Sequence, residues 1–317
     1  MSHAAKSAGL VVLALLAALL AGCGQTRPGA PLALDPVAAL PRSQTSHVVV
    51  IVMENKEASD VIGNQAAPYE NELARRYGLA TQSYAITHPS LPNYLALTSG
   101  STHGVNSDCT DCHVGARNIV DQLDAAGIPW RAYLEDVPRR CFTGAGAGGY
   151  AKKHNPFIYY DDIANSPSRC RNLVGFSALA ADLRRGTLPT YAWVSPNLCD
   201  DTHDCAVATG DRFLARLVPA LLREIGPQGF VVITWDEGSS GAGCCGGAAA
   251  GGRIATIVAG PQVRRGARAT APGDHYGVLG TIEDALGLPP LGGAADPRNG
   301  RLDSLFARSP KVRSAVG

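Results

Sequence analysis

Residues 87–100 read Thr-His-Pro-Ser-Leu-Pro-Asn-Tyr-Leu-Ala-Leu-Thr-Ser-Gly and place a serine where a loop turns into a short helix. Pro92 fits the first turn of a helix and Gly100 fits the position just past its end, so Ser90 should lie at the helix N-terminus. Backbone N–H groups and the positive end of the helix dipole favour an anion there, such as an alkoxide or a phosphate oxygen. The alternative is that Ser90 only caps the helix.

Acidic side chains stand directly after two apolar segments. Glu54 and Asn55 follow residues 47–53, and Asp236 and Glu237 follow residues 230–235. Each acidic pair alone could be solvated at the surface. Together they supply the hard oxygen ligands that divalent cations prefer, with the Ser90 hydroxyl as a further ligand. A cation on a serine hydroxyl lowers its pKa, which would prepare the oxygen for attack on phosphorus.

Two histidines extend this set of candidate residues. His203 closely follows Asp201 in a polar loop after a predicted strand, and such a pair can share one metal ion. His275 stands at the start of the last predicted helix. For His103 and His113 an ordinary surface or core position is the better interpretation.

The elements that must position these residues alternate along the chain. We predict strands at residues 47–53, 130–134, 190–194, 230–235 and 254–258, and helices at about 71–77, 117–126, 176–185, 210–225 and 275–286. This order predicts an α/β fold with a mainly parallel sheet sandwiched by helices. The carboxyl ends of parallel strands meet at one edge, so residues distant in sequence can converge there. The irregular stretch 138–171 predicts a lid or a disulfide-pinned loop, and 239–252 predicts a flap near Asp236.

The N-terminus has the pattern of an exported bacterial lipoprotein. Lys6 precedes the apolar run 10–20, which is too short to span a bilayer comfortably, and Leu-Ala-Gly leads into Cys23. We predict a signal peptide at 1–22, lipid on the Cys23 thiol and a proline-containing tether at 23–46. The protein would then be anchored to a membrane of the cell envelope, periplasmic or surface-exposed. The alternative is a secreted protein with a stray cysteine.

Composition bounds the remainder of the chain. The 317 residues, 45% of them hydrophobic, predict one large domain at 47–317. Lys and Arg number 28 against 27 Asp and Glu, so no nucleic-acid partner is expected. The sequence indicates no oligomeric state.

Eight cysteines remain after Cys23, an even number in an oxidising compartment, so disulfides are the default interpretation. We predict the pairs Cys141–Cys170 and Cys199–Cys205. The run Cys109-Thr-Asp-Cys112-His113 could suggest zinc or haem, but no second cysteine pair at metal spacing accompanies it, which favours local disulfides. The adjacent Cys244 and Cys245 have no explanation at this level.

Six segments together resemble a known family, in the expected order: residues 48–55, 87–100, 153–157, 196–205, 232–238 and 275–288. They are similar to the bacterial phosphoesterases that include acid phosphatases and phosphatidylcholine-type phospholipases C, within the alkaline-phosphatase-like superfamily. The resemblance implies that superfamily's fold and a hydrolase acting on phosphoric esters. Sulfatases share the superfamily, but Asn93-Tyr94 replaces the Ser-Arg of their signature.

The resemblance also implies roles for single residues. Ser90 matches the nucleophile, Asn93 a contact to the phosphoryl oxygen, and His154 a phosphate contact or leaving-group acid. The first metal site would use Glu54, Asn55, Ser90, Asp236 and Glu237, and the second would use Asp201, His203 and His275. Relatives with two zinc ions carry histidine where Glu237 stands, so a harder ion such as Ca²⁺, Mg²⁺ or Mn²⁺ is favoured over Zn²⁺. Either His203 or His275 would protonate the leaving alcohol.

Three functions remain open from the sequence. The first is a metal-dependent phosphoesterase of the acid-phosphatase type that acts on a phosphorylated small molecule or phospholipid through Ser90. The second is a phospholipase C that cleaves phosphodiesters. The third is a surface lipoprotein that binds phosphorylated ligands without turnover. The combination of Ser90 with several acidic partners favours an enzyme, since a binding protein has no use for an activated hydroxyl.

Overall fold

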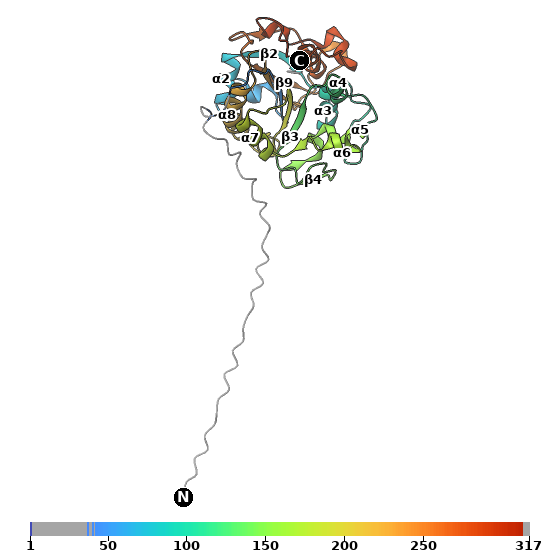
Figure 1. Cartoon of the computed structure of the whole chain (residues 1–317). Helices are drawn as coiled ribbons and strands as arrows, with labels where there is room; N and C mark the ends of the chain where they lie inside the picture. The colour runs from blue at the N-terminus through green and yellow to red at the C-terminus, as the bar shows by residue number, and fades with distance from the viewer. Residues whose placement is uncertain (2–36, 38–39, 41, 313–317) are drawn as a thin grey trace.

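The computed structural model describes residues 1, 37, 40 and 42–312 (Figure 1). Strand β1 (Val48–Met53) lies in the middle of the central sheet. All six of its residues are apolar and buried. It pairs in parallel with β7 (Tyr191–Ser195) on one side and β8 (Phe230–Trp235) on the other. A continuous run of β-branched residues suits a strand that is covered on both faces.

The sheet is mainly parallel, as predicted. Its strand order is β10-β2-β9-β8-β1-β7-β3-β6, with β11 also paired to β2. The remaining strands are β2 (Gly78–Tyr84), β3 (Trp130–Leu134), β6 (Leu173–Val174), β9 (Arg253–Ala259), β10 (Arg268–Ala269) and β11 (Gly273–Asp274). Only β9 runs against its neighbours, antiparallel to both β2 and β8. The strands that carry the predicted acidic residues, β1 and β8, are parallel and adjacent, so their carboxyl ends coincide.

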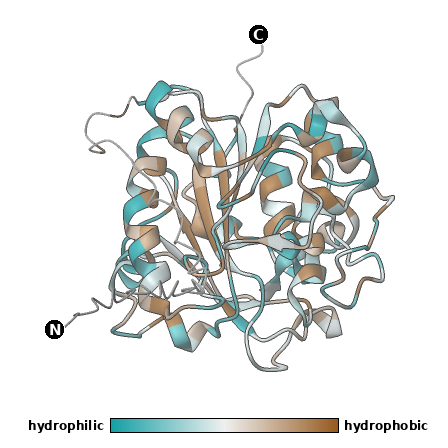
Figure 2. Ribbon diagram, turned by 90° about the horizontal axis from the view of Figure 1, so that it is seen from below, coloured by the Kyte–Doolittle hydropathy of each residue, from teal (hydrophilic) through white to brown (hydrophobic). Residues whose placement is uncertain are grey.

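Helices cover the sheet in two layers (Figures 1 and 2). Val48, Val50 and Val52 of β1 belong to the apolar cluster shared with α3 (Ser90–Ser99), α4 (Ile119–Ala125) and α9 (His275–Leu286). Val49 and Ile51 belong to the cluster shared with α2 (Pro68–Arg76), α7 (Phe176–Arg185) and α8 (Val207–Glu224). Alternate residues of the strand therefore pack against opposite layers, as its pleat requires.

The predicted elements agree closely with those observed. The helices at 176–185 and 275–286 and the strands at 130–134 and 230–235 have the predicted ends, whereas α8 begins at Val207, three residues earlier than expected. The shorter elements are α1 (Ala58–Val61), β4 (Gly146–Ala147), β5 (Tyr150–Ala151), α5 (Asp161–Ala164), α6 (Pro167–Cys170), η2 (Lys152–His154), η3 (Pro156–Tyr159), η4 (Cys245–Gly247), η5 (Gly292–Ala295), η6 (Pro297–Asn299) and η7 (Asp303–Leu305).

Four disulfides involve all eight cysteines of the described region. The predicted pairs Cys141–Cys170 and Cys199–Cys205 are confirmed, and Cys109 pairs locally with Cys112. Cys244 pairs with its immediate neighbour Cys245, which the sequence did not explain. The irregular stretch 138–171 is thus pinned at Cys141 and Cys170, as expected of a disulfide-held excursion.

The predicted signal peptide beyond Met1, the lipidation site Cys23 and most of the tether lie outside the described residues. Within the described part of the chain, no helix combines the length and the apolar character that crossing a membrane requires.

Candidate active site

Glu54 is the first residue after β1 and lies fully buried at the carboxyl edge of the sheet. The Tyr94 hydroxyl donates a hydrogen bond to its Oε1, and the Nε2 of His154 lies 3.2 Å from the same oxygen. Burial raises the pKa of Glu54 well above its usual range, and the nearby charges of Asp236 and Asp201 raise it further. The sheet thus places a carboxylate in a position where an ionised form needs positive charge nearby.

Ser90 is the first residue of α3, as predicted, and only 1% of its surface is exposed. Its Oγ lies 3.3 Å from Glu54 Oε2 and 3.4 Å from Glu237 Oε1. Pro89, not Ser90, occupies the N-cap position, so the serine hydroxyl faces the carboxylates and does not cap the helix. The helix ends where the sequence predicted, at Gly100, whose φ of 72° is a left-handed conformation that glycine adopts without strain.

Asp236 and Glu237 follow β8 and bring two further carboxylates to the same edge. Asp236 Oδ1 accepts a hydrogen bond of 3.0 Å from the backbone N–H of Asn55, whereas its buried Oδ2 has no hydrogen-bond partner among the described residues. Burial raises the pKa of Glu237 to about 7, and the Asp236 charge adds to this effect. Glu237 Oε2 lies 2.6 Å from the Nδ1 of His88.

These residues fit a divalent cation. Three carboxylates, from Glu54, Asp236 and Glu237, converge near one hydroxyl. Burial raises the pKa of each, and the Asp236 charge raises those of Glu54 and Glu237 further. Asp236 Oδ2, which is buried and has no hydrogen-bond partner among the described residues, is available as a ligand atom. The donors are all oxygen, which is the set that Mg²⁺, Ca²⁺ and Mn²⁺ favour.

His154 joins the predicted second group of ligands. Its Nδ1 lies 3.1 Å from Asp201 Oδ2, and its ring stacks on that of Tyr94 with a centroid separation of 5.5 Å. Burial lowers the pKa of His154 to about 3, so the ring is neutral near pH 7 and can offer a lone pair. One potential ligand atom from each of Glu54, His154 and His203 lies within 4.8 Å of the others. These three residues could therefore hold a second ion.

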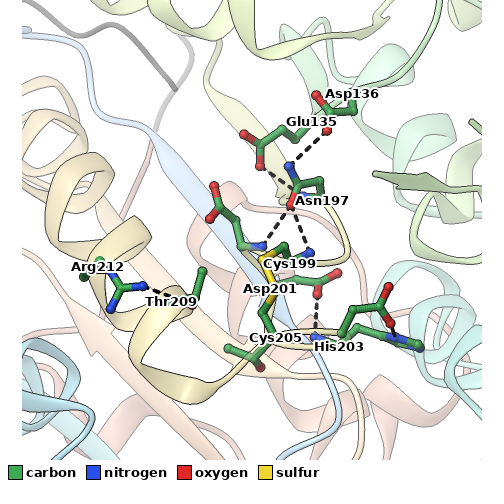
Figure 3. The surroundings of a disulfide bond; sticks show 12 residues. Glu135, Asp136, Asn197, Cys199, Asp201, His203, Cys205, Thr209 and Arg212 are labelled. Carbon is green, nitrogen blue, oxygen red and sulfur yellow. Dashed lines mark hydrogen bonds and ion pairs between the residues drawn. A yellow bond between two sulfur atoms is a disulfide. The ribbon is translucent and has the colours of Figure 1, made fainter. Parts of the chain in front are cut away.

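The loop that carries His203 is held by a disulfide and by Asn197 (Figure 3). Asn197 Oδ1 accepts hydrogen bonds from the N–H groups of Cys199 and Asp200, and its amide nitrogen donates to Asp136. The backbone N–H of His203 in turn donates to Asp201 Oδ1 at 2.7 Å. The Asn197 hydrogen bonds and the Cys199–Cys205 disulfide together hold Asp201 and His203 at the site.

Two predicted residues have surroundings that differ from those the resemblance implied. His275 is fully buried, and its Nε2 lies 2.6 Å from the backbone oxygen of Asp236, so its contacts are with the β8 end and not with Asp201 or His203. The Asn93 amide makes four hydrogen bonds to the backbone of residues 86–89, which use both of its donors and its acceptor oxygen twice. In this structure Asn93 shapes the loop before Ser90, and its contact to a phosphoryl group remains a prediction.

Three contributors were not predicted. Tyr94 stands four residues after Ser90, one helical turn along the same face, and this spacing could have revealed it. His88 links Glu237 to the predicted flap, because its Nε2 lies 3.0 Å from the backbone oxygen of Ser240. Asp108 accepts a hydrogen bond from the N–H of Leu91 and pairs with Lys153 at 2.9 Å. No local pattern marks Asp108, since a loop far from any strand end carries it.

Solved structures share this architecture. A protein of the alkaline phosphatase superfamily from Vibrio parahaemolyticus superposes with a TM-score of 0.55 at 15% identity, over 83% of this chain and 71% of that one. The lipoteichoic acid synthase of Listeria monocytogenes gives a TM-score of 0.57 at 10% identity, over 83% and 80% of the two chains. The predicted alkaline-phosphatase-like fold is confirmed.

Curated relatives are phosphatases. A phosphatidylinositol-3-phosphatase of Mycobacterium tuberculosis is 36% identical over 90% of this chain and 91% of its own length. A probable acid phosphatase of Kluyveromyces lactis and a phosphate-repressible acid phosphatase of Penicillium chrysogenum are each 29% identical, and this chain spans only 58% and 64% of their lengths. The Phosphoesterase family model matches residues 61–289. The chain therefore belongs to the phosphoesterase family and is a phosphoric ester hydrolase, as its sequence predicted.

Proposed function

We propose that the protein is a metal-dependent phosphomonoesterase whose nucleophile is Ser90. The observation that carries this proposal is the position of Ser90 Oγ at the N-terminus of α3, between carboxylate oxygens of Glu54 and Glu237. The neighbouring carboxylates of Glu54 and Glu237 can accept the proton of this buried hydroxyl. The hydroxyl also has the helix N-terminus beside it, which favours negative charge on a phosphoryl group.

The residues Glu54, Asn55, Ser90, Asp236 and Glu237 would hold the first cation, and Glu54, Asp201 and His154 a second. When bound, such a cation supplies positive charge that lowers the pKa of the serine hydroxyl and stabilises charge on the phosphoryl oxygens. The protein orients the carboxylates that would bind the cation. Tyr94 and His154 fix Glu54 from one side, and the N–H of Asn55 fixes Asp236 from the other.

The proposed reaction has two steps. Ser90 Oγ forms a bond to phosphorus while the bond from phosphorus to the leaving alcohol breaks, and the serine proton passes to a neighbouring carboxylate. The N-terminus of α3 stabilises charge on the transferred group. Water then cleaves the phosphoserine, which releases inorganic phosphate and returns a proton to Ser90.

We assign protonation of the leaving alcohol to His203. About a quarter of its side chain is exposed, at 25%, so it lies where a leaving group can depart. His275 is fully buried against the backbone of Asp236 and has no such access. The geometry thus favours one of the two candidates that the sequence left open.

The substrate that we propose is a phosphate monoester on a small molecule or on a phospholipid headgroup. The relative with 36% identity is a phosphatidylinositol-3-phosphatase, which supports a monoester, and the fungal relatives are acid phosphatases. Cleavage of phosphodiesters, as by a phospholipase C, is the second activity to test. Binding without turnover is the third.

Export and anchoring through Cys23 belong to the same proposal. The four disulfides of the described region support an oxidising compartment. Growth with a radiolabelled fatty acid should label the full-length protein, and Cys23→Ala should abolish the label while leaving the protein in the periplasm or medium. Labelling that persists in Cys23→Ala would contradict the anchor.

The experiment on activity uses full-length protein that has been stripped with a chelator and resupplied with single divalent metals. Release of p-nitrophenol is measured from p-nitrophenyl phosphate and from p-nitrophenyl phosphorylcholine, with Ser90→Ala in parallel. Metal-restored hydrolysis of the monoester that disappears in Ser90→Ala is the expected result. Preferential cleavage of the phosphorylcholine ester would favour the phospholipase, and no turnover with any metal would favour the binding protein.

A further inference from the structure

The donors beside Ser90 are already engaged by an acidic side chain. The backbone N–H of Leu91, the residue after the nucleophile, donates a hydrogen bond of 2.9 Å to Asp108 Oδ1. The Lys153 ammonium donates a hydrogen bond, also of 2.9 Å, to Asp108 Oδ2. An N–H at a helix N-terminus and a lysine are the groups that bind phosphate in proteins. One carboxylate thus binds two donors of the kind that a phosphoryl group uses.

Lys153 belongs to the site and not to the outer surface. Its ammonium lies 3.2 Å from the Nε2 of His203, and only 21% of its side chain is exposed. Asp108 is its ion-pair partner, with Lys153 Nζ 2.9 Å from Asp108 Oδ2.

Asp108 is held in place by its loop. The Cys109–Cys112 disulfide follows it directly, and the Lys152 ammonium donates a hydrogen bond to the backbone oxygen of Thr110. Two successive lysines of η2 thus fasten one short loop, Lys152 at Thr110 and Lys153 at Asp108. Such a loop keeps the Asp108 charge beside the N-terminus of α3.

We propose that Asp108 is a specificity-determining residue: its carboxylate engages Leu91 N–H and Lys153 beside Ser90 and thereby disfavours doubly charged phosphate groups relative to singly charged ones. The inference rests on the proposed function, because it assumes that the phosphoryl group binds at Ser90. A second negative charge on the ligand meets the Asp108 charge at short range and gains no contact with Lys153. A singly charged monoester or a diester meets less repulsion.

The test compares two phosphonates that differ by one methyl group and one negative charge, and release of methanol from the methyl ester is monitored so that only binding is compared. Phenylphosphonate, above its second ionisation, carries two charges, and methyl phenylphosphonate carries one. Their inhibition constants are measured at one fixed pH against p-nitrophenyl phosphate, with the full-length, metal-supplied wild type and Asp108→Asn. The asparagine keeps an acceptor for the Leu91 N–H and removes only the charge. Asp111→Asn is the matched control, since Asp111 is an exposed residue of the same disulfide loop.

In Asp108→Asn we expect the inhibition constant of phenylphosphonate to fall by about three- to fivefold and that of the methyl ester by roughly twofold or less, as expected for a partly exposed charge. Asp111→Asn should leave both constants unchanged. The gain should shrink in the double variant Lys153→Gln with Asp108→Asn, because the released lysine is its source. Equal changes for the two ligands, or no change, would overturn the proposal.

Two further readouts separate this inference from other failures. A purely structural Asp108 would lower the melting temperature or kcat of Asp108→Asn without altering the ratio of the two inhibition constants, and that result also overturns the proposal. Calorimetric titration of both ligands into Ser90→Ala repeats the comparison without catalysis. If Ser90→Ala hydrolyses substrate but the ratio still depends on Asp108, the nucleophile assignment fails and the specificity assignment stands.

Discussion

Among the described residues, one group of buried carboxylates lies at the Ser90 site and another lies between the helices α2 and α8. In the second group Glu70 is fully buried and neither of its carboxyl oxygens has a hydrogen-bond partner among the described residues. Asp211 accepts hydrogen bonds of 2.9 Å from the N–H groups of Tyr69 and Glu70. Both groups thus contain unpartnered acidic oxygen atoms, and burial alone does not distinguish them.

The difference lies in what surrounds each group. Burial raises the pKa of Glu70 to about 8, with a further contribution from the Asp211 charge, so Glu70 is mostly protonated at neutral pH. The Ser90 site gathers several carboxylates around a hydroxyl, with a histidine, a lysine and a helix N-terminus nearby. Burial raises carboxyl pKa values in both groups, so the distinguishing feature is that the first group converges on a hydroxyl at a helix N-terminus. This contrast makes distinct predictions for each group.

The largest expected effect is on activity at the first group. Ser90→Ala should reduce phosphomonoesterase kcat by roughly a thousandfold or more, because the substitution removes the proposed nucleophile. The melting temperature should change little, since the substitution removes one small side chain. Glu70→Gln provides the comparison and should keep kcat close to that of the wild type. Comparable losses of kcat in both variants would remove the distinction between the groups.

The next effect concerns the pH dependence of stability at the second group. The folded-state pKa of Glu70, about 8, lies above the usual value of 4.5, so its contribution to stability is complete below about pH 4.5 and is lost as the pH rises toward 8. Relative to Glu70→Gln, the wild-type free energy of unfolding should fall by about 1.4 kcal/mol per pH unit in this window. Urea unfolding at several pH values measures it, and a difference that is independent of pH would contradict the assignment.

A cation should stabilise only the first group. Adding Mg²⁺, Ca²⁺ or Mn²⁺ to chelator-treated protein should raise the free energy of unfolding, by about 2.7 kcal/mol at a concentration one hundred times the dissociation constant. Asp236→Asn removes a ligand and should abolish most of this gain. Asp211→Asn removes a carboxylate from the other group and should retain it. Thermal unfolding of both variants with and without metal measures this gain in stability. An equal loss of the gain in Asp236→Asn and Asp211→Asn would argue against a metal site at Ser90.

The smallest effect sharpens the role of Tyr94. Its hydroxyl donates to Glu54, so Tyr94→Phe removes one hydrogen bond to a buried carboxylate while keeping the ring against His154. We expect kcat/KM to fall about tenfold and stability to fall by about 1–3 kcal/mol. Steady-state kinetics and denaturant unfolding measure the two changes. Unchanged kinetics would show that Glu54 needs no orientation from this side.

The sequence predicted the framework of the site well, because strongly local signals define it. The β-branched run of β1 and the apolar run of β8 identify adjacent buried strands, and their carboxyl ends bring Glu54 and Asp236 together. The proline and glycine that bound α3 likewise located Ser90 at a helix start. Residues fixed by elements with regular patterns were therefore accessible to prediction.

The contacts made from irregular segments were not, although the family resemblance had named His154 and His275 as site residues. His154 reaches Asp201 from the excursion 138–171, whose path depends on the Cys141–Cys170 bridge and not on a periodic pattern. Asp108 comes from a disulfide loop, and its partner Leu91 N–H belongs to the backbone and has no sequence signature. The surroundings of His275 depend on how tightly α9 packs at the end of β8. Each of these contacts is set by tertiary structure.

Trapping of a phosphoserine tests most directly whether Ser90 Oγ attacks phosphorus. Metal-supplied full-length protein is mixed with p-nitrophenyl phosphate, quenched in acid within one turnover and digested, and the peptide that contains Ser90 is examined by mass spectrometry. This peptide should carry one phosphoryl group on Ser90, and the corresponding peptide of Ser90→Ala should carry none. A phosphoryl group on another residue, or turnover without any phosphorylated peptide, would contradict attack by Ser90.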